Sequence, residues 1–261
     1  MHRSGTSLVA QWLNAMGMHL GNTFLEGNFS NEKGHFEDMD FLQLHRQILR
    51  ENNLHPSGLR LIQNLVISDD QREKMKKLVI QKNSENNQWG WKEPRTCLFL
   101  DEYNQIITRA KYLIVYRNFN EVINSLVKRD LKELRNKTES GDIIRKGYYF
   151  LKYNIYRYFR TSKKQVEYLK TTLRYYDKII TFLSGINKDD YILCRLEDFN
   201  EHHEQIFNKL QNWGFQLTYM DFGKVFDEKL LHKQVSTFQY PADLINRIQK
   251  KENRLNQLEN I

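Results

Sequence analysis

The first seven residues constrain the fold of this chain more than any other stretch. They read Met-His-Arg-Ser-Gly-Thr-Ser, and a helical pattern of apolar residues follows at once and ends near Gly17. The first N–H groups of a helix have no partner within it, so a small-residue loop at that point can hold a phosphate or sulfate. Arg3 adds a planar charge and Ser4 a hydroxyl donor. The alternative is an ordinary helix with a Ser/Thr cap.

The loop lacks the lysine of a Walker A motif, in which Lys follows the second glycine. Here Thr6 follows Gly5, and the basic residue comes before the glycine. Arg-Ser-Gly-Thr-Ser before a hydrophobic helix resembles the 5′-phosphosulfate loop of sulfotransferases, which use 3′-phosphoadenosine 5′-phosphosulfate (PAPS). The resemblance implies that PAPS is bound by Arg3, Ser4, Gly5, Thr6 and Ser7, with Arg3 also acting in catalysis. One departure is Leu8, which stands where cytosolic relatives carry an aromatic that stacks on adenine.

A second segment points to the same chemistry. Residues 111–117 contain a continuous apolar run that predicts a strand buried on both faces and ending at Arg117. Asn118 predicts the cap of a following helix, and Ser125 lies two turns up that helix on the face of Asn118. Arg117 and Ser125 can therefore converge on one anion. Tyr-Arg-Asn with a serine eight residues after the arginine resembles the sulfotransferase 3′-phosphate site, whereas an incidental arginine after a strand is the alternative.

The segment from Gly34 to Asp40 predicts an acidic helix start. Its carboxylates can simply cap the helix, or one of them, or His35, can be a general base. In several sulfotransferases a Glu at the start of the helix after the phosphosulfate loop is the base. That resemblance favours Glu37, ahead of His35 and Asp38.

Residues 89–95, Trp-Gly-Trp-Lys-Glu-Pro-Arg, predict a short buried strand that runs into a polar loop. Lys92 and Arg95 would stand at its carboxyl end, where open parallel sheets bind ligands. The alternative is a surface ion pair with Glu93. The run is similar to the Lys-Asp/Glu-Pro-Arg segment of many bacterial and glycan-type sulfotransferases. This resemblance makes Lys92 a candidate for catalysis and acceptor binding, and Arg95 a candidate for acceptor binding.

The remaining segments complete an α/β pattern. A helical region rich in Tyr, Lys and Arg spans residues 143–183, and its first part predicts a cationic outer helix or the lining of an acceptor pocket. Residues 191–196 predict another buried strand. A loop at residues 232–238 is expected to close over the nucleotide, and the helix after Pro241 predicts a peripheral element or a partner surface.

Composition limits the partners. The chain of 261 residues is 40% apolar, is long enough for one α/β domain over residues 1–261, and holds no apolar window that could span a membrane. Its net charge of +8 suits an anionic donor, and no nucleic-acid signature is present. Cys97 and Cys194 do not form a disulfide framework, which favours a reducing, cytoplasmic setting. Oligomeric state is not predicted.

The sequence as a whole predicts a mostly parallel sheet of the P-loop type flanked by helices. We expect a strand to feed the first loop, usually at the centre of such a sheet; because the loop begins at Met1, that strand is expected to be missing and catalysis weak. The predicted reaction moves a sulfuryl group from PAPS, without a metal, to a hydroxyl or amine of a small molecule, lipid or glycan. The rival predictions are a nucleotide-dependent kinase and a nucleotide-binding protein without catalysis.

Overall fold

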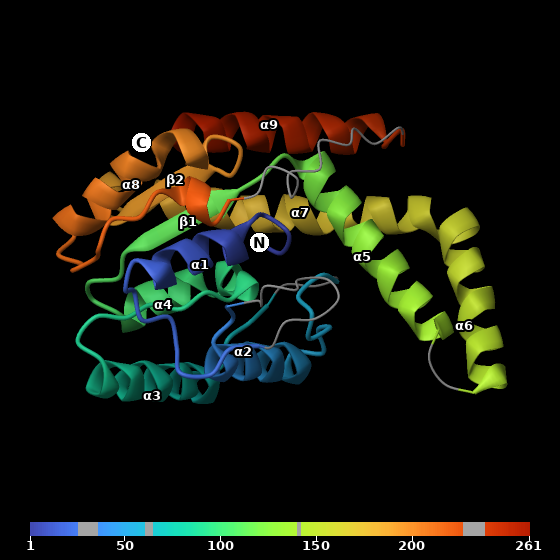
Figure 1. The fold of residues 1–261 in the computed structure, drawn as a ribbon, viewed down its shortest axis with the longest axis horizontal. Helices are drawn as coiled ribbons and strands as arrows, with labels where there is room; N and C mark the ends of the chain where they lie inside the picture. The colour runs from blue at the N-terminus through green and yellow to red at the C-terminus, as the bar shows by residue number, and fades with distance from the viewer. Residues whose placement is uncertain (26–35, 61–64, 140–141, 227–237) are drawn as a thin grey trace.

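The computed structural model describes residues 1–25, 36–60, 65–139, 142–226 and 238–261. Figure 1 shows a body of helices around a small sheet, with two helices extending to one side. The elements in chain order are α1 (Thr6–Ala15), α2 (Met39–Glu51), α3 (Asp69–Glu85), η1 (Pro94–Leu98), α4 (Leu100–Ile106), β1 (Tyr112–Tyr116), α5 (Phe119–Glu139), α6 (Ile143–Ile155), η2 (Tyr156–Arg160), α7 (Thr161–Ser184), η3 (Lys188–Asp190), β2 (Tyr191–Arg195), α8 (Phe199–Asn212), η4 (Phe222–Lys224) and α9 (Ala242–Leu258).

The sheet consists of β1 and β2, which are parallel and run in register from Tyr112 opposite Tyr191 to Tyr116 opposite Arg195. Both are the apolar runs predicted as buried strands. Alternate residues of each strand point to opposite faces, and here both faces are covered. The predicted α/β class is therefore confirmed, but the described part of the chain is mostly helix and its sheet has two strands.

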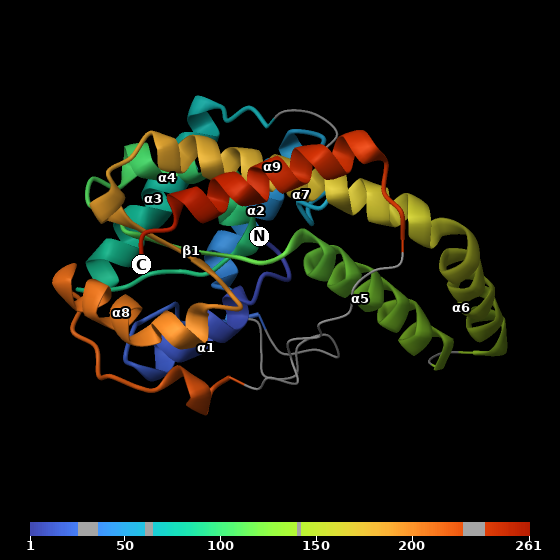
Figure 2. The ribbon, with the colours of Figure 1, turned by 90° about the horizontal axis from the view of Figure 1, so that it is seen from above.

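Two apolar clusters pack on the two faces of this sheet. Val115, Ile192 and Cys194 join one cluster with Trp12 of α1 and Phe199 of α8. The side chains that alternate with them on the two strands join the larger cluster, which includes α2, α5, α7 and α9; they are Ile114, Tyr116, Tyr191 and Leu193. Figure 2 shows α1 and α8 on one side of β1, with α4, α7 and α9 on the other. The result is a three-layer arrangement.

The free edge of β2 is covered by side chains from the residues after α9. Asn260 Oδ1 accepts a hydrogen bond from the Leu193 N–H at 3.1 Å, and its Nδ2 donates to the Tyr191 carbonyl at 2.8 Å. Glu259 Oε1 accepts from the Arg195 N–H at 3.1 Å. These bonds satisfy the backbone groups that an edge strand otherwise leaves unpaired.

One predicted strand is wrong. The structure assigns no strand to residues 89–93, which lead directly into η1. The segment is fixed by aromatic stacking instead of strand pairing: the rings of Trp91 and Phe41 lie 4.2 Å apart and nearly parallel. Its Gly90 N–H donates to the His19 carbonyl at 2.9 Å. In so short a run, an alternating apolar pattern fits both strand pairing and aromatic stacking, so it does not show which of the two buries the side chains.

The predicted helical region at 143–183 is confirmed as α6, η2 and α7, and the two ends of that region differ. No α6 residue is buried, which confirms the cationic outer helix, whereas α7 runs through the core. The apolar face of α9 packs along α7, with Leu255 fully buried, so this chain itself covers the face predicted to meet a partner. Nearly all of the predicted loop at 232–238 lies outside the described residues.

Candidate functional site

The first loop enters α1 through backbone conformations that favour glycine. Gly5 has φ 78° and is the N-cap of α1, and Arg3 also has a positive φ of 62°. A Cβ on Gly5 would lie 2.4 Å from the side chain of Leu196, the residue that follows β2. Position 5 therefore needs glycine both for its φ and for this close approach. The contact places the loop at the carboxyl end of the sheet, where ligands bind in open α/β folds.

The two predicted halves of the donor site meet through one hydrogen bond. Arg3 Nε donates to Ser125 Oγ at 2.8 Å, which joins the first loop to α5. Beside Arg3, the Ser4 side chain is 1% exposed, and no residue of the described ranges hydrogen-bonds its Oγ. Buried hydroxyls are nearly always paired. An unpaired hydroxyl at the N-terminus of a helix therefore fits an anion held there.

Positive charges surround this point. The pKa of Arg3 is lowered by burial and by the nearby charges of Arg129 and Arg117. The pKa of His2 is well below its ordinary value, first because of burial and then because of Arg95, Arg129, the terminal amine and Lys92. Groups that depress one another's pKa in this way are cations held close together. Such a cluster favours an anionic ligand.

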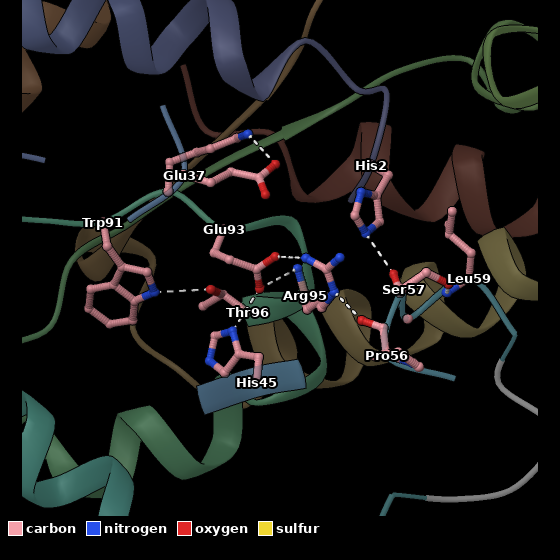
Figure 3. A network of polar contacts seen from close by, with 12 residues as sticks. His2, Glu37, His45, Pro56, Ser57, Leu59, Trp91, Glu93, Arg95 and Thr96 are labelled. Atoms are coloured by element: carbon pink, nitrogen blue, oxygen red, sulfur yellow. Dashed lines mark hydrogen bonds and ion pairs between the residues drawn. The ribbon is translucent and has the colours of Figure 1, made fainter. Parts of the chain in front are cut away.

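Lys92 connects the loop to the predicted base. Its Nζ donates to Ser7 Oγ and to Glu37 Oε1, both at 3.0 Å, and Glu37 is 6% exposed. Burial lowers the pKa of Lys92, an effect that the Glu37 charge opposes. Figure 3 shows Glu37 above the network around Glu93. Glu37, Lys92 and the loop are thus brought together as predicted, whereas His35 lies outside the described residues.

Asp38, the other predicted base, is held by structural contacts. Its Oδ1 accepts from the N–H groups of Asp40 and Phe41 at the start of α2. Its Oδ2 accepts from Lys82 Nζ at 3.0 Å, and both side chains of that pair are at most 3% exposed. These bonds make Asp38 a helix cap and half of a buried ion pair.

Arg95 lies in a buried network, away from the open surface. Its Nε donates to the Pro56 carbonyl at 2.8 Å, and its guanidinium pairs with Glu93. Glu93 also bonds His45 Nδ1 at 2.6 Å (Figure 3), and His45 Nε2 bonds the Tyr103 hydroxyl at 2.8 Å. Arg95 is 4% exposed, and the network links η1 to α2 and α4. The surface ion pair considered for Glu93 is therefore wrong, because this pair is internal.

Arg117 follows β1 as predicted but carries acidic partners that sequence reasoning did not assign to it. Its guanidinium bonds Glu121 at 2.6 Å and lies 3.5 Å from Glu197. The Tyr176 hydroxyl donates to the Arg117 carbonyl at 2.5 Å and fixes the backbone there. Arg3 contacts Ser125, and the charge of Arg117 lowers the pKa of Arg3, while the two carboxylates hold Arg117. The spacing of four residues between Arg117 and Glu121 was the signal for this pair.

Arg129 is the cation that sequence reasoning missed. It stands one helical turn beyond Ser125 on α5, so the two share a face. A hollow between α5 and α6, bordered by Lys132, Arg135 and Tyr153, lies further out on the same helix. Because α-helices rise 1.5 Å per residue, Arg135 lies about 15 Å along α5 from Ser125. This hollow is therefore separate from the site at Arg3.

Comparison with known proteins gives one structural likeness. The sulfotransferase domain from the curacin biosynthetic pathway superposes with a TM-score of 0.51 at 15% sequence identity, over 97% of this chain and 94% of that domain. At this identity the likeness shows a shared fold. No family model matches the chain, and no curated protein matches it in sequence.

The described residues lack two kinds of feature. They contain no group of three or more His, Cys, Asp or Glu side chains placed to hold a metal ion. None of their helices combines the length and the apolarity that crossing a membrane requires.

Proposed function

We propose that this chain is a sulfotransferase that moves a sulfuryl group from PAPS to a hydroxyl or amine. The observation that carries the proposal is the hydrogen bond from Arg3 to Ser125, which joins two motifs far apart in the sequence. The charges of Arg117 and Arg129 act on Arg3, and the buried hydroxyl of Ser4 has no hydrogen-bond partner among the described residues. PAPS carries a 5′-phosphosulfate and a 3′-phosphate, and a site that binds both groups needs such a combination of helix N–H groups, hydroxyls and guanidiniums.

The residues divide into groups with separate tasks. The N–H groups of the first loop, Arg3 and Ser4 would hold the 5′ end of the donor, and Arg117 with Ser125 would hold its 3′-phosphate. PAPS supplies the activated sulfuryl group when it is bound. The loop and Arg3 stabilise negative charge at the leaving oxygen, as positioned donors do in related transfers.

The acceptor side would use Glu37 and Lys92. Glu37 can accept the proton that the attacking hydroxyl or amine gives up. Lys92 bonds both Glu37 and Ser7, so it holds that carboxylate next to the donor loop. In the same place its ammonium group can offset charge on the group being transferred. The acceptor class remains a small molecule, lipid or glycan in this proposal.

The test compares two nucleotides in a thermal-shift experiment. We expect 3′-phosphoadenosine 5′-phosphate to raise the melting temperature, because a ligand at a hundred times its Kd stabilises the folded state by about 2.7 kcal/mol. We expect ATP with magnesium to have little effect. Stabilisation by ATP and magnesium alone would instead favour a kinase.

A second measurement separates binding from catalysis. Labelled PAPS would be incubated with glycans, lipids and small phenols, and transfer would be followed directly. Transfer to any acceptor class supports the proposal and names the acceptor. Strong binding of the bisphosphate with no transfer to any class would favour a nucleotide-binding protein without catalysis.

A further inference from the structure

The end of α5 together with α6 and η2 forms an arm that extends away from the body (Figures 1 and 2). One side of α6 packs against α5. On that side the Tyr156 hydroxyl donates to Asp130 at 2.8 Å, and the Lys137 ammonium group lies over the Tyr149 ring. These contacts fix which face of α6 turns inward.

The opposite side of the arm is apolar and exposed. Eight of the eleven exposed large hydrophobic side chains in the described residues lie on α6 and η2. We call them the outer face: Ile143, Ile144, Tyr148, Phe150, Leu151, Ile155, Tyr158 and Phe159. Ile144 is 86% exposed and Leu151 is 60% exposed. Five members, from Ile144 to Tyr158, recur at alternating spacings of four and three residues, which align them in one stripe along the helix.

Positive charges border the outer face, and no acidic residue interrupts it. Residues 143–164 contain seven Lys or Arg and no Asp or Glu. At 100° per residue, Arg145 and Lys152 fall along one border of the stripe, whereas Lys146 and Arg157 fall beyond Phe150, at the far edge of the outer face. The Lys152 ammonium group lies 5.6 Å from the centre of the Tyr148 ring, so its stem covers part of the apolar surface.

We propose that the outer face binds the surface of an anionic lipid bilayer, with α6 lying in the plane of the interface. Three features of the arm fit this one partner. The apolar stripe would enter the boundary between headgroups and acyl chains, and the bordering cations would meet anionic headgroups. Tyr148 and Tyr158 combine an aromatic ring with a polar tip, as side chains at membrane interfaces do. This inference does not depend on the proposed function.

A second copy of the chain fits less well. A two-fold interface places the same patch of both subunits together. Here it would bring together the cations that border the outer face of both copies, with no acid on the outer face to offset them. Like charges facing each other across an interface oppose association. A bilayer with anionic headgroups offers the opposite charge.

The test is cosedimentation of the full chain with vesicles. One set would be pure phosphatidylcholine, and the other would contain about one third phosphatidylserine. We expect at least about tenfold stronger binding to the anionic vesicles, with weaker binding as salt is raised. Leu151→Glu should abolish most of the binding, because it places a charge in the middle of the stripe. Ile80→Glu is the matched control, since Ile80 is 56% exposed but lies on α3.

Two charge-reversal variants test the borders of the outer face. Lys152→Glu should weaken binding to the anionic vesicles severalfold, because it reverses one bordering charge. Lys77→Glu makes the same change at an exposed position of α3 and should bind like the wild type. Circular dichroism and melting temperature would show that all variants fold.

Three outcomes would overturn the inference. Equal binding to both kinds of vesicle, or none to either, excludes an anionic bilayer as the partner. Unchanged binding by Leu151→Glu means that general positive charge, and not the outer face, attracts the vesicles. If the wild-type chain does not bind vesicles but forms a dimer, and Leu151→Glu converts that dimer to a monomer, then the outer face binds a second copy of the chain.

Discussion

Arg3 and Ser125 are 122 positions apart in the chain and are joined by a hydrogen bond of 2.8 Å between Nε and Oγ. The bond connects the loop before α1 to the first half of α5. Because Arg117 and Arg129 lower the pKa of Arg3, the same point carries three neighbouring guanidinium groups. Glu121 pairs with Arg117 and Asp130 pairs with Arg129, and under the proposed function a bound phosphate or sulfate would add a further negative charge to this group.

Arg117→Ala tests the 3′-phosphate contact. Loss of a hydrogen bond to a charged group costs about 1.5–3 kcal/mol, so affinity for 3′-phosphoadenosine 5′-phosphate should fall about tenfold to a hundredfold. Calorimetric titration of the bisphosphate measures it. Arg135→Ala is the control, because Arg135 is an exposed arginine of α5 paired with Glu139. Equal affinity in both variants would remove Arg117 from the donor site.

Glu37→Gln tests the proposed base. The amide keeps the shape of the side chain but cannot accept the proton, so turnover should fall by about 10²–10⁴. Donor affinity should stay close to that of the wild type, since Glu37 is assigned to the acceptor side. Single-turnover assays with labelled PAPS give the rate, and titration gives the affinity. If both fall together, Glu37 is part of donor binding and another group is the base.

Asp38→Asn should act on stability. The change removes the charge that faces Lys82 in a pair of buried side chains, while Lys82 keeps Asp40 at 2.6 Å. We expect a loss of about 1–3 kcal/mol in the free energy of unfolding. Thermal denaturation would measure it, with Asp40→Asn as the milder control because Asp40 is 55% exposed. A fall in turnover per folded molecule, with stability unchanged, would make Asp38 the base.

Glu252 predicts a pH dependence of stability. Burial raises the pKa of Glu252 to about 7, although the Phe119 N–H and Arg195 lower it. In the unfolded chain the pKa is about 4.3, so the folded chain holds the proton more tightly. Protonated Glu252 therefore contributes its full stabilisation to the folded state below about pH 4.3, and this contribution is lost as the pH rises through about 7.

The variant Glu252→Gln isolates that effect. The amide oxygen can still accept from the Phe119 N–H, a bond of 2.7 Å to Glu252 in the wild type, but it carries no charge at any pH. Melting temperatures of the two proteins should agree at about pH 4, and the variant should melt higher at about pH 8. A constant difference across this range would show that Glu252 does not titrate in it.

Local patterns in the sequence were sufficient to predict the strands and helices that bury continuous apolar runs. β1 and β2 follow directly from such runs, and α6 follows from its mixture of cations and aromatics without acids. The strand predicted at Trp91 was wrong because the Trp91 ring is buried by stacking on Phe41, which is 50 positions away in the sequence. Periodicity reports that a side chain is buried but not what buries it.

The residues of the candidate site were identified from local patterns together with the resemblance to sulfotransferases. The structure brings Lys92, Glu37 and the first loop together. The network that holds Arg95 was not predictable, because His45 comes from another helix and carries no local signal. Glu197 at Arg117 shows the same limit, because it reaches Arg117 only after β2 has paired with β1.

The side chains that cover β2 have a consequence for synthesis of the chain on the ribosome. Asn260 and Glu259 are made 67 and 64 positions after the backbone groups that they bond. A nascent chain that already contains β2 therefore has an open strand edge until Glu259 and Asn260 emerge, and open edges favour pairing with other chains. Polysomes that carry many copies at this stage bring such edges close together. Chaperones that bind nascent chains should accordingly have their greatest effect on yield during translation of the final stretch, after β2 and before Glu259.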